Sequence, residues 1–343
     1  MMAEPENKAG EDIFARPPGP PIAAPLVAII GPTASGKSSL GVWLAEHLNG
    51  EIVVCDSTQV YRGFDIGTSK PTAEERRRVA HHLIDFLEPS EVFTAGEYRE
   101  RAIAVLNDLR FRERLPILTA GTGLYLRALL EGLADVPVRS EVLRANLRAR
   151  AERNKPGYLH RVLARMDPIA AERIDAGDMP KLIRAIEICV LSGKPITEVH
   201  QGARARLEGF RPVKIGLMPP RTALYERIER RTIEMMDRGW LREVRALLQR
   251  GIPKTSKPFS FIGYGDLRAH LEGKCELPKS VAAIQQATRH YAKRQITWFR
   301  KEQGVHWLEG FGDDPAIMRR ALTHLRAELG EGYESANQAA AGG

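Results

Sequence analysis

The chain has 343 residues, of which 43% are hydrophobic and 27% charged, and its formal net charge is +8. This balance is typical of a globular protein and excludes a fibrous or largely disordered chain. The surplus of Lys and Arg favours an anionic partner such as nucleic acid.

The cysteines and the chain ends narrow the class further. Cys55, Cys189 and Cys275 are widely spaced and never form a C-x-x-C pair, so neither a disulfide framework nor a zinc site is expected. No apolar run reaches the length of about 18 residues that a membrane helix needs. Residues 1–24 lack the features of a signal peptide, and we expect them and residues 326–343 to be disordered tails.

A short apolar strand from Leu26 leads directly into a complete phosphate-binding loop, Gly31-Pro-Thr-Ala-Ser-Gly-Lys-Ser38. Its glycines let successive N–H groups curl around an anion, the following helix adds partial positive charge, and Lys37 adds a full one. The Ser38 hydroxyl can bind Mg²⁺. We predict that a di- or triphosphate, from a nucleotide or from another source, is held by Gly31, Pro32, Thr33, Ala34, Ser35, Gly36, Lys37 and Ser38.

The hydrophobic pattern predicts alternating strands and helices in the first part of the chain. Helices are expected at 39–48, 73–80 and 95–111, and strands at 51–56 and 115–119. This alternation predicts an α/β fold with a doubly wound parallel sheet, like that of P-loop NTPases. The turns at 31–38, 56–59 and 120–123 would then meet at the carboxyl ends of the strands.

The second half of the chain begins with a different pattern. Residues 140–202 are Arg-rich and lack strand signals, which predicts a helical insertion lobe between a core part at 25–139 and a third part at 203–325. The third part is expected to return to the core and to be mainly helical. It has predicted strands at 213–217 and 305–308 and predicted helices at 224–238, 241–249 and 281–301.

Two polar side chains follow predicted strands beside the phosphate loop. Asp56 ends a buried strand, where a carboxylate acts as a Mg²⁺ ligand, a general base or a structural cap. Thr122 lies between two glycines, where it either touches a substrate or simply suits a tight turn. The third strand ends Thr119-Ala120-Gly121 and lacks the acidic residue that ends the corresponding strand in motor NTPases. This absence favours another diphosphate over ATP as the ligand.

Basic residues cluster on two predicted helices. Arg227 and Arg231 share a helix face and, with Arg221, suit a diphosphate clamp, with surface solvation as the alternative. On the helix at 281–301, Arg289, Lys293 and Arg300 lie opposite an apolar face. No acid interrupts that helix, which favours an RNA backbone over a merely solvated face.

Together these motifs resemble the tRNA dimethylallyltransferases, also called tRNA isopentenyltransferases, from about Leu26 to Leu308. The segments that carry the resemblance are Gly31–Ser38, Asp56–Gly63, Asp65–Pro71, Ala120–Tyr125, Leu182–Glu187, Ile262–Tyr264 and Lys293–Arg300. It implies transfer of a dimethylallyl group from its diphosphate to N6 of the adenosine 3′ of a tRNA anticodon, with Mg²⁺ as cofactor.

The resemblance also assigns roles to residues. Asp56 would be the general base, Lys37 would stabilise the leaving diphosphate, and Thr122 would contact the tRNA near the pocket. The contacts to the tRNA anticodon stem-loop would come from Asp56, Ser57, Thr58, Gln59, Thr122, Arg144, Lys181, Arg184, Tyr264, Lys293, Arg294 and Arg300. Arg221 and Arg227 remain the predicted arginines of the diphosphate site. We expect a monomer in the cytoplasm.

The chain departs from the family pattern at Ala120, at Pro180-Lys181 and at Gly265. Three alternatives stay open on the residues alone. They are a small-molecule P-loop kinase, a prenyltransferase acting on free AMP or ATP, and a non-catalytic RNA-binding protein. The lobe and the basic helix argue against a free nucleotide as acceptor, because a mononucleotide needs neither.

Overall fold

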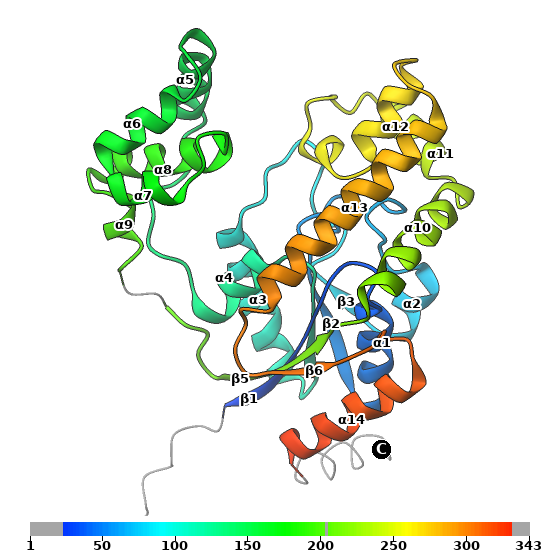
Figure 1. Ribbon diagram of the computed structural model, residues 1–343. Helices are drawn as coiled ribbons and strands as arrows, with labels where there is room; N and C mark the ends of the chain where they lie inside the picture. The colour runs from blue at the N-terminus through cyan, green and yellow to red at the C-terminus, as the bar shows by residue number, and fades with distance from the viewer. Residues whose placement is uncertain (1–22, 203–204, 331–343) are drawn as a thin grey trace, which may run out of the picture.

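The computed structural model describes residues 23–202 and 205–330, in which the strands form a six-stranded, entirely parallel sheet of order β3-β2-β4-β1-β5-β6 (Figure 1). The strands are β1 Ala24–Ile30, β2 Gly50–Cys55, β3 His81–His82, β4 Leu115–Ala120, β5 Phe210–Leu217 and β6 Val305–Leu308. Because the chain moves outward from β1 in both directions, the sheet is doubly wound. The predicted P-loop NTPase-like α/β fold is confirmed.

Helices cover both faces of this sheet. Those of the core are α1 Lys37–His47, α2 Ala73–Arg78, α3 Ala95–Phe111, α4 Gly123–Glu131, α10 Arg221–Asp237, α11 Trp240–Gln249, α12 Tyr264–Leu271, α13 Leu277–Phe299 and α14 Pro315–Leu329, with a 3₁₀ turn at Lys257–Ser260. Helices α1 and α14 pack on one face, and α3 and α4 on the other.

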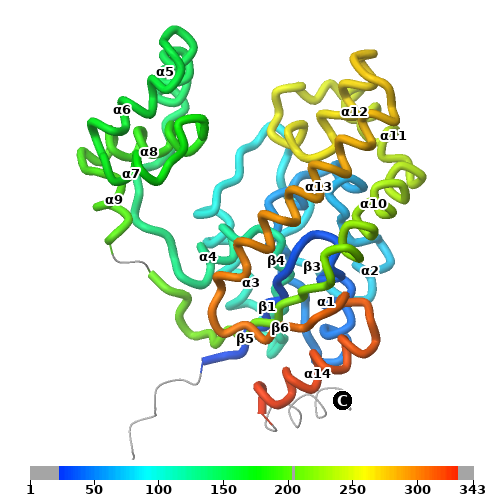
Figure 2. The backbone as a smooth tube through the Cα atoms, in the orientation of Figure 1, coloured from blue at the N-terminus to red at the C-terminus, as the bar shows by residue number. Residues whose placement is uncertain are grey.

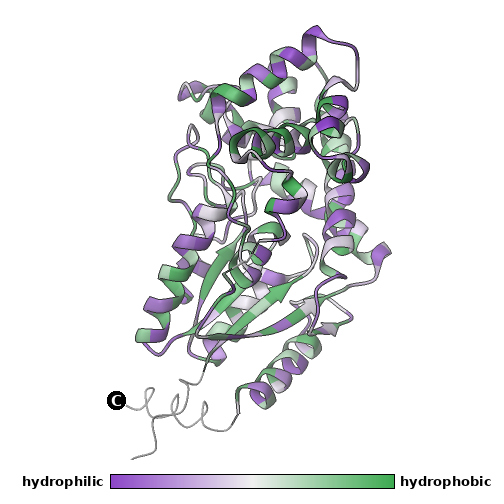
Figure 3. Cartoon of the chain, turned by 90° about the vertical axis from the view of Figure 1, so that its left-hand side faces the viewer, coloured by the Kyte–Doolittle hydropathy of each residue, from purple (hydrophilic) through white to green (hydrophobic). Residues whose placement is uncertain are grey.

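The side chains of β1 show why helices must cover both faces of the sheet. Val27 and Ile29 belong to the core under α1 and α14, whereas Ala28 and Ile30 belong to the core under α3 and α4. All four side chains are fully buried, as in a central parallel strand. The hydropathy colouring of Figure 3 shows the same layering, with hydrophobic strands between helices of mixed character.

A separate group of helices forms a lobe beside the core (Figures 1 and 2). It consists of α5 Glu141–Arg153, α6 Tyr158–Met166, α7 Pro168–Arg173, α8 Met179–Ser192 and α9 Ile196–Val199, and it has its own hydrophobic core. Figure 2 shows that the segment before α5 leads back toward the sheet, as does the chain from residue 205 on, which continues into β5. Burying apolar residues among its own helices allows this lobe to be ordered away from the sheet.

The long loop after β2 is anchored by α11 and α12. Glu243 accepts hydrogen bonds from the backbone N–H of Ile66 at 2.7 Å and from the Tyr264 hydroxyl at 2.6 Å. Phe64, Trp240 and Tyr264 pack together in the same core. A Cβ on Gly67 would lie 2.3 Å from Trp240, so the loop can approach that ring only with glycine there. These contacts fix the loop that begins with Asp56.

Most predicted elements agree with the structure to within a few residues, and both predicted tails overlap elements of the structure. The predicted tail at 1–24 is wrong for Ala24, which begins β1 and pairs with β5. Helix α14 continues to Leu329, so the predicted tail at 326–343 is wrong for its first residues, because Leu325 is buried against the sheet. Helices α4, α12 and α14 were not predicted. The remainder of the two predicted tails, residues 1–22 and 331–343, lies outside the described residues. The division of the chain into functional domains stays a prediction.

Candidate active site

The phosphate-binding loop joins β1 to α1 at the carboxyl end of the sheet. Gly31 and Gly36 have φ angles of 148° and 88°, and Gly36 caps α1. A Cβ on Gly36 would lie 2.7 Å from the backbone nitrogen of Gly312, which leaves no room for any other residue. The backbone of this loop therefore has the conformation that the motif predicts.

Lys37 lies within this loop and folds back over it. Its Nζ donates to the carbonyl oxygens of Gly31 at 2.9 Å and Pro32 at 2.7 Å. Burial, opposed by the charge of Asp56 and aided by that of Arg231, lowers the pKa of Lys37 to about 7. Because burial disfavours the charged form of Lys37, an anion beside its ammonium group would stabilise that charged form strongly.

Asp56 follows β2 and is held in one orientation. Its Oδ1 accepts hydrogen bonds from the backbone N–H of Thr58 at 2.8 Å and from the Thr58 hydroxyl at 2.6 Å. Its Oδ2 faces Gly121, where a Cβ would lie only 2.6 Å away. One carboxylate oxygen of Asp56 is therefore bound within its own loop, and the other faces the turn after β4.

Thr122 lies in that turn and contacts the segment after Asp56. Its Oγ1 accepts from the backbone N–H of Ser57 at 3.0 Å, and it donates to the Ser57 hydroxyl at 3.3 Å. In the sheet, β4 lies between β2 and β1, so this turn lies between Asp56 and the phosphate loop. The structure therefore brings together the three turns that the strand pattern placed at this edge.

Two residues of α13 complete the site. Gln295 belongs to the segment Lys293–Arg300 that carries the resemblance, but neither Gln295 nor Tyr291 was predicted individually as a site residue. Gln295 accepts from the backbone N–H of Thr33 and donates to the carbonyl oxygen of Gly121. The Tyr291 hydroxyl donates to the same Gly121 oxygen at 3.3 Å. Their spacing of four residues on one helix is the available sequence signal, but it does not reveal which loops they reach.

The arginines of α10 have different surroundings. Nη1 and Nη2 of Arg227 each donate to the Asp313 carboxylate at 2.7 Å, so this guanidinium already has an ion-pair partner. Burial lowers the pKa of Arg231 to about 10, and its charge reaches Lys37. Arg231 forms no hydrogen bond or ion pair with any described residue. The predicted clamp of Arg227 and Arg231 thus divides into a paired arginine and one without an ion-pair partner among the described residues, whose charge acts on Lys37.

A cavity of about 430 Å³ opens between α10 and α13. Its lining consists of Met218, Pro219, Pro220, Arg221, Tyr225, Lys293, Ile296, Thr297, Arg300 and Glu309. Arg221 stacks on the Tyr225 ring and donates to its hydroxyl at 3.0 Å. The cavity therefore combines an arginine predicted for the diphosphate with two basic residues predicted for the RNA.

Other predicted RNA contacts take part in structural interactions. Arg144 and Arg184 donate to the fully buried Glu187 at 2.7 and 2.6 Å, within the lobe. Tyr264 is also fully buried, which leaves its side chain unable to contact an RNA in this conformation. Gln59 donates to the backbone oxygens of Thr68 and Ser69 and so braces its own loop. Lys181 is exposed and pairs with Asp178.

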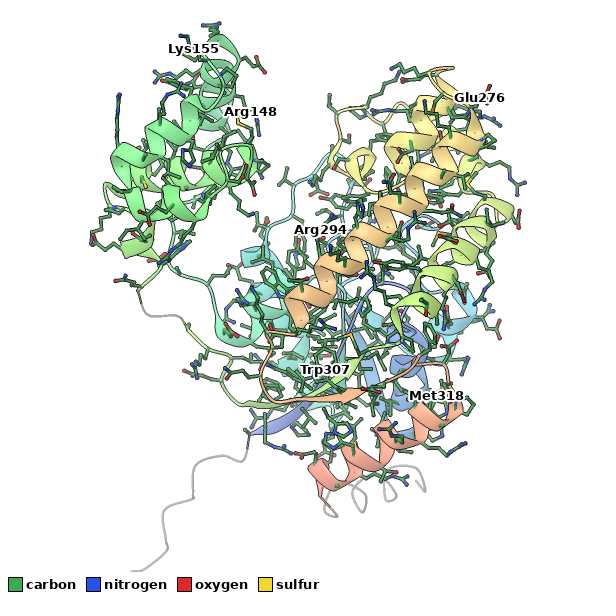
Figure 4. All side chains as sticks on the ribbon, in the orientation of Figure 1. Arg148, Lys155, Glu276, Arg294, Trp307 and Met318 are labelled. Carbon is green, nitrogen blue, oxygen red and sulfur yellow. The ribbon has the colours of Figure 1, made fainter. Side chains whose placement is uncertain are left out.

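Helix α13 presents basic residues in the centre of the molecule, where Figure 4 labels Arg294. Lys293, Arg294 and Arg300 are exposed and form no ion pair with the described residues. Arg289 is different, because it pairs with Glu229 of α10 at 2.7 Å. The prediction of a basic face without acidic partners is therefore wrong at Arg289, since the partner comes from a neighbouring helix.

The residues present fit a magnesium ion that binds together with a diphosphate. No group of three or more His, Cys, Asp or Glu side chains in the described part of the chain could hold a metal. Mg²⁺ needs no such group, since it keeps several waters and binds through one or two protein oxygens and the phosphates of a ligand. Ser38 is exposed at the first turn of α1 and has a hydroxyl that could serve.

Comparison with known proteins identifies relatives that cover almost the whole chain. The model of the IPP transferase family matches residues 59–302. A tRNA dimethylallyltransferase of Koribacter versatilis is 53% identical over 88% of this chain and 98% of its own length. One from Solibacter usitatus is 48% identical over 90% of this chain and 100% of its own length.

Solved structures agree with these sequence relatives. The full-length tRNA isopentenylpyrophosphate transferase of Bacillus halodurans has a TM-score of 0.65 and 36% identity, over 91% of this chain and 99% of its own. A eukaryotic dimethylallyltransferase acting on tRNA has a TM-score of 0.72 and 26% identity, over 88% of this chain and 78% of its own. None of the helices described here has the length and apolar composition to span a bilayer.

Proposed function

The chain belongs to the IPP transferase family, and we propose that it transfers a dimethylallyl group from dimethylallyl diphosphate to N6 of the tRNA adenosine 3′ of the anticodon. The observation that carries this proposal is the meeting of three turns at neighbouring strand ends. The phosphate loop follows β1, Thr122 follows β4 and Asp56 follows β2. A diphosphate and an amine can therefore be held on either side of one small turn.

The phosphate loop is suited to the departure of diphosphate. As the bond between the allylic carbon and its oxygen breaks, the electron pair goes to the diphosphate, whose negative charge grows. The loop N–H groups and Lys37 lie where this charge develops, so they stabilise the transition state more than the ground state. The charge of Arg231 also acts on Lys37, and this half-buried arginine would add a second cation to the site.

Asp56 is suited to accept a proton from the attacking amine. The adenine N6 forms the new bond to the allylic carbon and must lose one proton. Oδ1 of Asp56 is occupied by Thr58, and Oδ2 remains to accept that proton. The charge of this carboxylate acts on the Lys37 amine, which supports a base close to the leaving-group site.

A magnesium ion would be held by the Ser38 hydroxyl and the diphosphate oxygens. When bound, it supplies further positive charge to the leaving group. We propose Mg²⁺ for this position because the oxygen donors and the phosphate loop suit it.

The RNA is proposed to bind across α13 and the lobe. Lys293, Arg294 and Arg300 are exposed cations without ion-pair partners among the described residues, which suits a phosphate backbone. In a single-stranded loop, the target base can be flipped out and inserted into a pocket at a cost of a few kcal/mol. We further propose a cytoplasmic monomer, since all the proposed site residues come from one chain and its three cysteines are free.

The direct test is incubation of the protein and Mg²⁺ with radiolabelled dimethylallyl diphosphate and unmodified tRNA, with AMP and ATP as alternative acceptors. We expect label in the tRNA alone. Label in AMP or ATP alone would instead assign the chain to free-nucleotide prenylation, and no transfer to any acceptor would contradict the proposal.

A further inference from the structure

Gln295 connects two loops that are far apart in the sequence. Its Oε1 accepts a hydrogen bond from the backbone N–H of Thr33 at 2.7 Å, and its Nε2 donates to the carbonyl oxygen of Gly121 at 2.8 Å. These partners lie 262 and 174 residues away along the chain. A primary amide can both accept and donate, so one side chain satisfies both backbone groups.

In the proposed reaction, one of these loops would hold the leaving diphosphate, and the other adjoins the base that accepts the proton of the amine. Thr33 lies in the phosphate loop, and Gly121 precedes Thr122 and touches Asp56. A Cβ on Gly121 would lie 3.9 Å from the Gln295 amide and 2.6 Å from the Asp56 carboxylate. Gly121 is therefore the one residue between Gln295 and the proposed base, and a movement of Gln295 would shift Gly121 relative to Asp56.

The surroundings of Gln295 prevent water from replacing it easily. Its exposed fraction is 6%, and its neighbour Ala292 on α13 is fully buried. Tyr291, one turn earlier, donates to the same Gly121 oxygen and covers one side of the bond. Without the amide, the Thr33 N–H would lose its partner and the Gly121 carbonyl would keep only the longer bond from Tyr291.

We propose that Gln295 is a positioning residue that fixes the distance between the phosphate loop and the turn of Asp56 and Thr122. This inference rests on the proposed prenyl transfer, in which carbon and nitrogen must meet within a few tenths of an ångström of a productive geometry. Gln295 itself takes no proton and forms no bond to substrate. Its effect is on the rate of the chemical step, because a misplacement of about 1 Å can slow a reaction about 100-fold.

The test compares Gln295→Met with Gln295→Glu and uses Gln285→Met as the matched control. Methionine keeps the length of the side chain and removes both hydrogen bonds. Glutamate keeps the acceptor for Thr33 but cannot donate to Gly121 as a carboxylate. Gln285 lies on the same helix and donates only to the backbone oxygen of Glu229 at 3.3 Å.

We expect the single-turnover rate of Gln295→Met to fall about 100-fold, while the Kd for tRNA stays within about twofold. Gln295→Glu should also react slowly, because it loses the bond to Gly121. Gln285→Met should react normally. A Gln295→Met protein that reacts like Gln285→Met, or that loses tRNA binding in proportion to rate, would overturn the proposal.

Amide hydrogen exchange separates this inference from the proposed function, because it needs no activity. The N–H of Thr33 should exchange slowly in the unliganded protein and at least tenfold faster in Gln295→Met, which removes its acceptor. Equal exchange in the two proteins overturns the bridge even if transfer to tRNA is observed. Slow exchange in a protein that modifies no tRNA would support the bridge and refute the transferase.

Discussion

Replacing Gly121 with Ala should slow prenyl transfer strongly while leaving the fold and the tRNA affinity intact. The φ angle of Gly121 is not in the left-handed region, so alanine fits its backbone without strain. The obstacle is the Asp56 carboxylate, because an added Cβ would lie 2.6 Å from Oδ2. The proposed base has to move or the turn has to open.

The required movement can be taken from the contact distance. Ordinary van der Waals contact begins at 3.4 Å, so the carboxylate or the turn must shift by about 0.8 Å. Asp56 cannot rotate away freely, since Thr58 holds its other oxygen through two hydrogen bonds. A shift of this size at a reacting group corresponds to a loss of rate of about 100-fold.

The assay is single-turnover transfer to a tRNA transcript, with Gly96→Ala as the control. A Cβ on Gly96 meets nothing closer than 3.8 Å, and alanine is favoured over glycine in a helix by up to about 1 kcal/mol. Gly96→Ala should therefore react normally. A Gly121→Ala protein that reacts within threefold of the unchanged enzyme would refute the argument that this contact constrains the base.

The remaining predictions concern three charged groups. Asp56→Asn should keep its bond from the Thr58 N–H and bind tRNA, but react about 10²- to 10⁴-fold more slowly, and a normal rate would remove Asp56 as the base. Lys37 has a pKa lowered to about 7 by burial, so diphosphate binding above that pH must take up a proton. Affinity measured by calorimetry should then weaken as pH rises above about 7, by up to tenfold per unit, and Lys37→Met should lack this dependence. Glu187→Gln should destabilise the lobe by about 3 kcal/mol in urea unfolding, because two arginines lose a buried partner. Burial raises the pKa of Glu187, but hydrogen bonds from these arginines outweigh it and lower the pKa to about 2, so its stabilising effect is full above pH 4.5 and is lost as the pH falls through about 2. An unchanged unfolding curve for Glu187→Gln would contradict this account.

The fold was predictable because its signals are local. Helix α3 was predicted at 95–111 and found there, beginning at a capping box formed by Thr94 and Glu97. The phosphate loop, Asp56 and Thr122 each follow an apolar strand, and adjacent parallel strands end at the same edge. No knowledge of distant contacts was needed to bring them together.

The parts that could not be predicted depend on contacts between distant segments. Gln295 lies in the segment Lys293–Arg300 that carries the resemblance, but its two backbone partners become evident only when the loops of β1 and β4 are placed against it. The sequence makes Arg227 and Arg289 look like free cations because their acids, Asp313 and Glu229, lie in distant segments of the chain. A helix pattern gives the face on which a charge lies, whereas its partner is set by tertiary packing.

The most direct measurement of the central claim is mass spectrometry of nuclease fragments from a tRNA incubated with dimethylallyl diphosphate and either the unchanged protein or Asp56→Asn. The account predicts one isopentenyl group, on the adenosine 3′ of the anticodon, with the unchanged protein, and almost none with Asp56→Asn. Modification of another nucleotide, or equal modification by both proteins, would contradict it.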